Sequence, residues 1–314
     1  MNSDFQLLLF LILTAVTLSC TSESPEQSPQ FNASDTTHSL QVVSGSVDRY
    51  HIESQFIDAR NVDIWLPGNY SSDKKYSVVY MHDGQMLFDS TQTWNGQEWK
   101  VDETVSTLMK NDQIEDIIVV GIWNNEEERH AEYFPEKAID NINQPERDSL
   151  LQLLATPPKA DNYLKFLTDE LKPFIDKSYA TSTDPEHTFV MGSSMGGLIS
   201  IYAISEYPGI FGGAACMSTH WIGSFEPNDV IPGAINKYLQ NNLPEAGDHK
   251  IYFDHGTETL DASYPPYQDL IDQTMRSKGY TKDNWQSRSF AGADHSEDSW
   301  AQRLEIPLQF LLSK

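Results

Sequence analysis

The chain has 314 residues, of which 39% are hydrophobic and 21% are charged, a composition typical of one large globular domain. Asp and Glu outnumber Lys and Arg by 46 to 21, which leaves a formal net charge of −25. Because such a surface repels phosphate backbones and anionic lipid headgroups, the charge argues against nucleic acid as a partner.

The first twenty residues differ from the rest of the chain. An apolar run over 5–18 is followed by Cys20, a pattern that resembles the lipobox of bacterial lipoproteins, in which the cysteine is acylated. We therefore expect a signal peptide over 1–19 and a lipid on Cys20. The chain would then be exported to the bacterial cell envelope, on the periplasmic or outer-membrane side, and would meet the membrane only through this anchor. A plain cleaved signal or an uncleaved anchor is the alternative.

The rest of the chain divides into a tether and one domain. Residues 20–39 are rich in Ser, Pro and acidic side chains and predict a flexible tether. Over 40–314, strand-like and helix-like segments alternate, which predicts a single three-layer α/β domain: a mostly parallel sheet with helices on both faces.

The predicted elements follow in chain order. The strands are expected at 41–47, 62–66, 76–81, 117–122, 188–191, 213–217, 250–254 and 284–290. The helices are expected at 101–109, 163–174, 198–205, 235–243, 267–277 and 299–312, the last interrupted near Pro307. Between two of these elements, about 123–160 is acidic and proline-containing, which predicts an irregular excursion and makes it a candidate cap, with its role as a lid left open.

A serine motif stands between a predicted strand and a predicted helix. Residues 192–196 read Gly-Ser-Ser-Met-Gly and fit G-x-S-x-G, the pattern of the nucleophile elbow of α/β-hydrolases, with Ser194 as the nucleophile. A serine hydroxyl needs a base, and the base needs a carboxylate that orients it. In this fold the three residues follow the chain order Ser, acid, His.

That order selects the partners of Ser194. Four histidines follow the serine, and of these His295 comes after the last predicted strand, directly before the final helix. His295 is therefore the expected general base. The acid should follow the strand at 250–254, where the loop offers Asp261 and Glu258. We prefer Asp261, since aspartate is the commoner third member, and keep Glu258 as the alternative.

The same loops predict the rest of the pocket. Backbone N–H groups of Met195 and of Gln85, the latter after the strand at 76–81, are the expected oxyanion donors. His220 and Trp221 follow the strand at 213–217 and are candidates for substrate binding, with packing in the interior as the alternative. Neither a metal motif nor a cofactor motif is present in the sequence, and the triad chemistry requires neither.

Three segments together resemble the putative-esterase branch of the α/β-hydrolases. They are Tyr-Met-His-Asp-Gly-Gln at 80–85, Gly-Ser-Ser-Met-Gly-Gly at 192–197 and Asp-His-Ser-Glu at 294–297. That branch contains S-formylglutathione hydrolase, feruloyl and acetyl-xylan esterases, enterobactin esterases and mycolyltransferases. The resemblance covers about 40–312 and implies the roles given above for Ser194, His295 and Gln85. It leaves the acid and the substrate open.

The expected function is that of a serine esterase that works through an acyl-enzyme on a small-molecule or glycan-linked ester, with a carbohydrate-linked ester preferred. Siderophore ester cleavage and acyl transfer on the same triad are alternatives. A different class of function, a non-catalytic surface lipoprotein that binds glycan, would not need the complete set of serine, acid and histidine.

Overall fold

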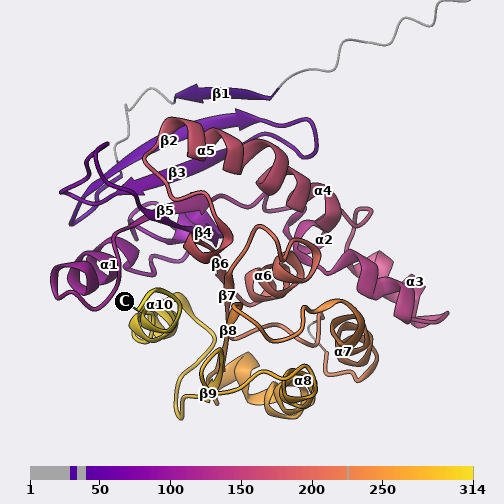
Figure 1. Cartoon of the computed structure of the whole chain (residues 1–314). Helices are drawn as coiled ribbons and strands as arrows, with labels where there is room; N and C mark the ends of the chain where they lie inside the picture. The colour runs from indigo at the N-terminus through magenta and orange to yellow at the C-terminus, as the bar shows by residue number, and fades with distance from the viewer. Residues whose placement is uncertain (1–28, 34–39, 225, 314) are drawn as a thin grey trace, which may run out of the picture.

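A computed structural model describes residues 29–33, 40–224 and 226–313. The predicted signal peptide and Cys20 lie outside these residues. Within the described part, one nine-stranded sheet has the order β1-β2-β3-β5-β4-β6-β7-β8-β9 (Figure 1). The strands are β1 Gln30–Ala33, β2 Ser46–Glu53, β3 Arg60–Leu66, β4 Ser77–His82, β5 Ile117–Ile122, β6 Thr188–Ser193, β7 Gly213–Met217, β8 Lys250–His255 and β9 Trp285–Ser289.

The pairing of the strands divides the sheet into two parts. β1, β2, β3 and β5 are joined antiparallel. From β5 across to β9, every neighbouring pair is parallel. The carboxyl ends of β4, β6, β7, β8 and β9 therefore meet at one edge of the sheet, where open α/β sheets place their binding sites.

Helices cover both faces of the sheet. The α-helices are α1 Val101–Lys110, α2 Arg129–Tyr133, α3 Glu146–Leu153, α4 Ala160–Lys165, α5 Lys172–Ser178, α6 Met195–Glu206, α7 Val230–Asn242, α8 Pro265–Ser277, α9 Glu297–Ala301 and α10 Glu305–Leu312. The shorter helical turns are η1 Gly84–Met86, η2 Glu136–Asn141, the π-helical η3 Phe166–Leu171, η4 Pro185–His187 and η5 Thr259–Ser263. None of the helices in the described part is long and apolar enough to span a membrane.

Alternation along the strands separates two buried clusters, one on each face. Val78 and Tyr80 of β4 belong to the cluster that packs under α6 and α7, whereas Val79 and Met81 belong to the cluster under α1 and α10. Figure 1 shows α1 and α10 on one side of the sheet and α6, α7 and α8 on the other. The predicted three-layer α/β fold is confirmed.

The predicted strand at 41–47 was wrong, because β2 begins only at Ser46. Residues before it are held by side chains rather than by a neighbouring strand: the backbone N–H of Gln41 donates to Asp89 (2.9 Å), and that of Val43 to Asp102 (2.6 Å). Gly45 then turns the chain into the sheet with φ +79°, where a Cβ would lie 2.3 Å from a carbonyl oxygen.

The predicted tether also contains structure. Gln30–Ala33 forms β1, which pairs with β2 at the sheet edge, and the ring of Phe31 stacks on Phe174 with 4.1 Å between centroids. The flexible-tether prediction was therefore wrong for these four residues. A single aromatic residue in a polar segment gives too weak a pattern to predict a strand, but it is enough to pack against an aromatic surface that is already folded.

Two further boundaries differ from the sequence prediction. The last helix is interrupted at 302–304, between α9 and α10, and not near Pro307. Pro307 is the third residue of α10, where its missing N–H removes no helical hydrogen bond. The excursion at 123–160 was predicted to be irregular, but it forms α2, η2 and α3, and its buried residues include Tyr133, Phe134 and Ile139, which join the core under α6.

Candidate active site

Ser194 lies on a tight turn between β6 and α6. Its backbone has φ 56° and ψ −121°, a region that strains every residue except glycine. The turn is held on both sides, because Ser194 N donates to Met217 O (3.0 Å) and His220 N donates to Ser194 O (3.1 Å). Within 191–200, Ser194 alone is partly exposed, and its neighbours are buried. A strained and accessible serine of this kind fits a nucleophile elbow.

Glycines let the strand and the helix of this turn come close together. A Cβ on Gly192 would lie 2.9 Å from the backbone of Gly196. A Cβ on Gly197 would lie 2.8 Å from the hydroxyl of Thr219. Both distances are shorter than real Cβ atoms show, so the small residues of the motif are required by packing and not only by the turn.

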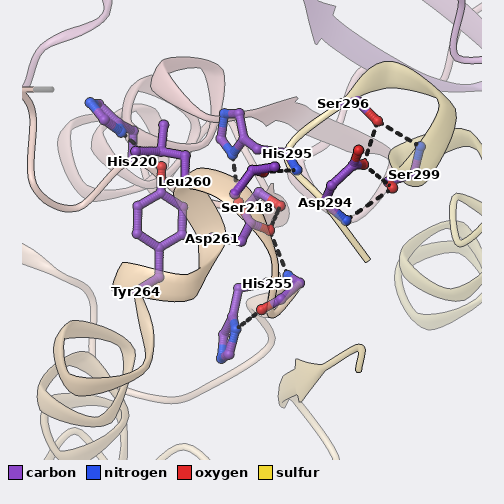
Figure 2. A network of polar contacts seen from close by, with 12 residues as sticks. Ser218, His220, His255, Leu260, Asp261, Tyr264, Asp294, His295, Ser296 and Ser299 are labelled. Atoms are coloured by element: carbon purple, nitrogen blue, oxygen red, sulfur yellow. Dashed lines mark hydrogen bonds and ion pairs between the residues drawn. The ribbon is translucent and has the colours of Figure 1, made fainter. Parts of the chain in front are cut away.

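His295 and Asp261 are in direct contact at this edge of the sheet. Nδ1 of His295 lies 2.5 Å from Oδ1 of Asp261, which is fully buried in η5 (Figure 2). Thr259 at the start of the same turn accepts a hydrogen bond from the backbone N–H of His295 (2.9 Å). Glu258, the alternative acid, is exposed directly before the turn. The structure thus brings Asp261, and not Glu258, to the histidine.

The buried carboxylate of Asp261 is fully hydrogen-bonded. Its Oδ2 accepts from the hydroxyl of Ser218 (2.5 Å) and from the backbone N–H of Gly256 (2.5 Å). Burial alone would raise the pKa of Asp261, but His295, Ser218 and Gly256 lower it below the usual value. Asp261 is therefore an anion at neutral pH and can stabilise a positive charge on the imidazole.

The end of β7 connects the serine with the acid. Met217, its last residue, accepts from the backbone of Ser194, and the next residue, Ser218, donates to Asp261. Four loops at the carboxyl edge of the sheet therefore supply Ser194, Ser218, Asp261 and His295.

The loop after β4 places Gln85 beside the same edge. Gly84 packs so tightly that a Cβ there would lie 2.5 Å from the backbone of Gly121 in β5, which fixes the path of the loop. The N–H groups of the first turn of a helix have no acceptor within that helix. Gln85 lies in η1, and Met195 is the first residue of α6, so both amides have the local setting that oxyanion donors need.

An ion pair that the sequence did not predict holds this loop. Arg129 of α2 binds both carboxylate oxygens of Asp83, at 2.7 Å each, and the side-chain amide of Asn124 donates to the same carboxylate (2.6 Å). Burial alone would raise the pKa of Asp83, but Arg129 and Asn124 lower it below its usual value. The Gln85 side chain accepts from the backbone N–H of Asn124 (3.2 Å). The excursion therefore fixes the orientation of the loop.

A second ion pair holds α2 in place. Its Glu132 forms a bidentate pair with Arg60 of β3, with N–O distances of 2.6 and 2.8 Å and almost no exposure of either side chain. Next to this pair, Nδ1 of His82 lies 2.8 Å from the hydroxyl of Tyr163, and burial lowers the pKa of His82 to about 3. His82 is therefore a neutral residue of the interior behind the loop.

The two predicted pocket residues lie in different surroundings. Trp221 is buried, packs on Phe253 and donates its N–H to Gln268 (2.9 Å), so its indole belongs to the core. His220 is bound to the nucleophile turn through its backbone, and its Nδ1 lies 2.8 Å from the hydroxyl of Tyr264. Burial, together with the nearby His295, lowers the pKa of His220 to about 3.

A cavity of about 700 Å³ lies on the outer side of the loop that carries His295. It is lined by residues 290–294 and by α9, but neither Ser194 nor His295 lines it. Among the described residues, no group of three or more His, Cys, Asp or Glu side chains could hold a metal ion. The thiol of Cys216, a residue of β7, is buried in the core, and burial raises its pKa well above the usual value.

Comparison with solved structures shows the fold. A ferulic acid esterase from Anaeromyces mucronatus aligns over 88% of this chain and 96% of its own, with a TM-score of 0.59 and 18% identity. The enterobactin esterase of Shigella flexneri aligns over 87% of this chain and 60% of its own, with a TM-score of 0.60 and 16% identity.

Comparison of sequences shows the family. The uncharacterised protein YbbA of Bacillus subtilis is 22% identical over 261 residues, which cover 81% of this chain and 93% of that protein. The family model described as putative esterase matches residues 54–310, which is most of the chain. The chain therefore belongs to the putative esterase family of the α/β-hydrolases and is a carboxylic ester hydrolase.

Proposed function

We propose that the protein is a serine esterase in which Ser194 attacks the ester carbonyl and His295 accepts its proton. Asp261 orients the imidazole and stabilises its positive charge. The amides of Gln85 and Met195 stabilise the oxyanion of the tetrahedral intermediate. Loss of the alcohol leaves an acyl group on Ser194, and a water molecule that His295 deprotonates then releases the acid.

The observation that carries this proposal is the contact between Nδ1 of His295 and the buried Asp261, at the same edge of the sheet as the strained turn of Ser194. A carboxylate at Nδ1 leaves the other ring nitrogen free to act as the base. A glycan-binding protein without activity would have no need of a buried, fully hydrogen-bonded carboxylate at this histidine. The geometry therefore supports catalysis rather than binding alone.

The preferred substrate is a carbohydrate-linked ester. Two features support it: the lipobox-like segment that ends at Cys20 suggests an enzyme anchored outside the cytoplasm, and a ferulic acid esterase has the same fold. Siderophore ester cleavage is the second candidate, because an enterobactin esterase also has this fold. Acyl transfer differs from both only in the acceptor, which replaces water.

The first experiment compares hydrolysis of short p-nitrophenyl esters by the wild type, Ser194→Ala and Ser200→Ala. Ser200 lies two turns further along α6 and bonds only the carbonyl of Gly196, so it is a matched loss of a hydroxyl. We expect kcat to fall on the order of 10⁴-fold or more in Ser194→Ala, by analogy with triad knockouts. Ser200→Ala should stay within about threefold of the wild type. Equal activity of the wild type and Ser194→Ala would refute the proposal.

The second experiment identifies the substrate. The wild type would be given feruloylated and acetylated xylan fragments, a cyclic triester of catecholoylserine, and each ester together with a sugar alcohol as acceptor. The highest kcat/KM on the xylan esters would support the preferred substrate. The highest value on the triester would favour the siderophore alternative, and acylated sugar as the main product would favour acyl transfer.

A further inference from the structure

Ser218, the residue after β7, has a strained backbone at the centre of a buried polar network. Its φ is 40°, in the region that favours glycine, and its side chain is fully buried. The backbone N–H donates to the carbonyl of Asp254 (2.9 Å) and lies 3.1 Å from the carboxylate of the same residue. A strained serine persists only where its contacts compensate for the strain, so the contacts of its hydroxyl need an explanation.

The hydroxyl of Ser218 has three partners, and their chemistry fixes its direction. Nη2 of Arg303 lies 2.8 Å away, and Nε1 of Trp300 lies 3.0 Å away. Both of these groups are donors that cannot accept. The single hydrogen of the hydroxyl must therefore go to the remaining partner, Oδ2 of Asp261 at 2.5 Å (Figure 2).

The positive charge of Arg303, which contacts the hydroxyl of Ser218, is balanced by a buried carboxylate. Arg303 donates to both oxygens of Asp254, at 3.2 Å and 3.1 Å, and neither side chain is more than 4% exposed. Nη2 of Arg303 stays 4.0 Å from Oδ2 of Asp261, which is too far for a hydrogen bond. Asp254 thus neutralises the guanidinium, and the serine hydroxyl is the group that connects it with Asp261.

We propose that Ser218 is a positioning residue of the catalytic centre, whose hydroxyl holds Oδ2 of Asp261 so that Oδ1 faces Nδ1 of His295. Arg303 and Trp300 act on the acid through this hydroxyl and not directly. The inference rests on the proposed function, because it assigns to Ser218 the task of orienting the acid of the proposed triad. It explains why a serine, and not a glycine, occupies a left-handed position at the end of β7.

The test uses Ser218→Gly and Ser218→Ala in the full chain. Glycine adopts φ 40° without strain, whereas alanine keeps the strain, so the two variants share the loss of the hydroxyl but differ in stability. Thr219→Val is the matched control, because it removes a buried hydroxyl of the same turn that bonds only the carbonyl of Cys216 (3.1 Å). Ser194→Ala is the second control and reports on the proposed function itself.

Two readouts separate positioning from stability. The first is kcat/KM for a p-nitrophenyl ester against pH, and the second is the rate at which a fluorophosphonate labels Ser194, which does not depend on finding the natural substrate. We expect both Ser218 variants to lose about 10- to 100-fold in both rates, as for the loss of a hydrogen bond to a charged group. KM should change little, because Ser218 contacts the acid and not the substrate.

The pH profile adds a signature that a purely structural role would not produce. The ionisable groups around His295 and Ser218 include His220, Asp254, Asp261, Tyr264, Asp294 and Arg303. Without the hydroxyl, Oδ1 of Asp261 is no longer held against Nδ1 of His295, so its negative charge stabilises a positive charge on the imidazole less. The midpoint of the acidic limb of kcat/KM should therefore move to lower pH by about half a unit.

The possible outcomes are distinct. Impairment of both Ser218 variants, normal Thr219→Val and a displaced acidic limb would support the proposal. Full activity in Ser218→Gly with loss only in Ser218→Ala would overturn it, because backbone strain would then explain the position. Normal rates in both, while Ser194→Ala is inactive, would also overturn it and leave the esterase proposal intact. A wild type that neither hydrolyses esters nor reacts with the fluorophosphonate would overturn both proposals.

Discussion

Both sides of the candidate site contain an ion pair between an arginine and a carboxylate, but the two pairs differ in their exposure to solvent. On the acid side, the pair of Arg303 and Asp254 lies behind Asp261, with side chains 4% and 0% exposed. On the side of Gln85, the proposed oxyanion donor (the oxyanion side), the pair of Arg129 and Asp83 holds the loop of Gln85, with side chains 22% and 11% exposed. Each side thus uses an arginine to fix a carboxylate, one in the interior and one at the border of the solvent.

The two sides should differ in whether a substitution affects stability, catalysis or both. The acid side is assembled from β7, β8 and the segment after β9, which the sheet already brings together. The oxyanion side depends on α2, a helix of the excursion that is held in place by the ion pairs Arg60–Glu132 and Arg129–Asp83. We therefore expect changes on the acid side to affect folding and catalysis together, and changes of Arg129 to affect mainly catalysis.

The largest effect is expected from the acid itself. Asp261→Asn keeps the shape of the side chain but no longer holds the imidazole in the required tautomer, so kcat should fall by about 10⁴-fold. Glu258→Gln, its matched control three residues earlier, should change kcat by less than about twofold, since that side chain is exposed. Steady-state kinetics of both variants decide this, and the reverse ranking would assign the acid to Glu258.

The second-largest effect is expected from breaking the ion pair of Arg303 and Asp254, which lies behind Asp261. Arg303→Met leaves Asp254 buried without its cation, which should lower the free energy of unfolding by about 3–5 kcal/mol at pH 8. Burial already raises the pKa of Asp254 in spite of Arg303. A carboxyl group whose pKa is raised in the folded state stabilises the fold at low pH, and this stabilisation is lost as the pH rises through that pKa. The destabilisation caused by Arg303→Met should therefore be smaller near pH 5 than at pH 8.

Urea unfolding of this variant at both pH values provides the measurement. Arg276→Met is the control, because Arg276 is 62% exposed and lies 4.0 Å from its partner Asp272. A loss below about 1 kcal/mol, or one that grows at acidic pH, would contradict the account of the acid side.

Arg129→Met tests the ion pair on the oxyanion side. Without the guanidinium, Asp83 and the loop of Gln85 lose their connection to α2, and we expect kcat to fall about 10- to 100-fold, less than for the direct loss of an oxyanion donor. The free energy of unfolding should fall by only about 1 kcal/mol, because the pair is in part exposed to solvent.

Arg147→Met is the control for Arg129, since Arg147 forms an exposed pair with Asp140 in the same excursion. Kinetics and urea unfolding are measured on the same preparations. Normal kcat in Arg129→Met would show that α2 does not position the loop, and a loss of stability equal to that of Arg303→Met would remove the contrast between the two sides.

The smallest effect is expected from a carboxyl group that has acidic neighbours in place of an arginine. Burial and the nearby Asp102 raise the pKa of Glu103 in α1 to about 7. Its stabilising contribution is complete below its unfolded pKa and is lost as the pH rises through about 7. Glu103→Gln should therefore raise the free energy of unfolding at pH 8 by about 1 kcal/mol, a value that allows for the partial exposure of the side chain.

At pH 4.5 the gain from Glu103→Gln should vanish, because the native carboxyl group is then protonated. Glu126→Gln, at an exposed position, is expected to show no such dependence on pH. A gain that is the same at both pH values would mean that ionisation of Glu103 is not its cause.

The sequence was sufficient where a local pattern and the order of the elements agree. The glycine-flanked Ser194 between a strand and a helix, and His295 after the last strand, could be proposed from the sequence because each occupies a fixed place in the chain order of the fold. Most strands of the parallel part lie within a few residues of their predicted places, because buried strands have continuous apolar sequences.

The rest depends on tertiary contacts that no local pattern contains. Asp261 and Glu258 share one turn, and only burial and the distance to His295 separate them. Arg129 is one of several charged residues in an acidic excursion, and nothing in its neighbourhood indicates that Asp83 is its partner. Ser218 precedes the two residues that were considered for the pocket, but its direct contact is with the acid.

In the proposed mechanism, Ser194 carries the acyl group during turnover. The decisive experiment mixes the enzyme with a slowly deacylating p-nitrophenyl ester, quenches the reaction in acid and locates the acyl group by peptide mass spectrometry. We expect one acyl group, on the peptide that contains Ser194, and none in Ser194→Ala. Ester turnover with the acyl group on another residue, or turnover that persists in Ser194→Ala, would contradict the proposed mechanism.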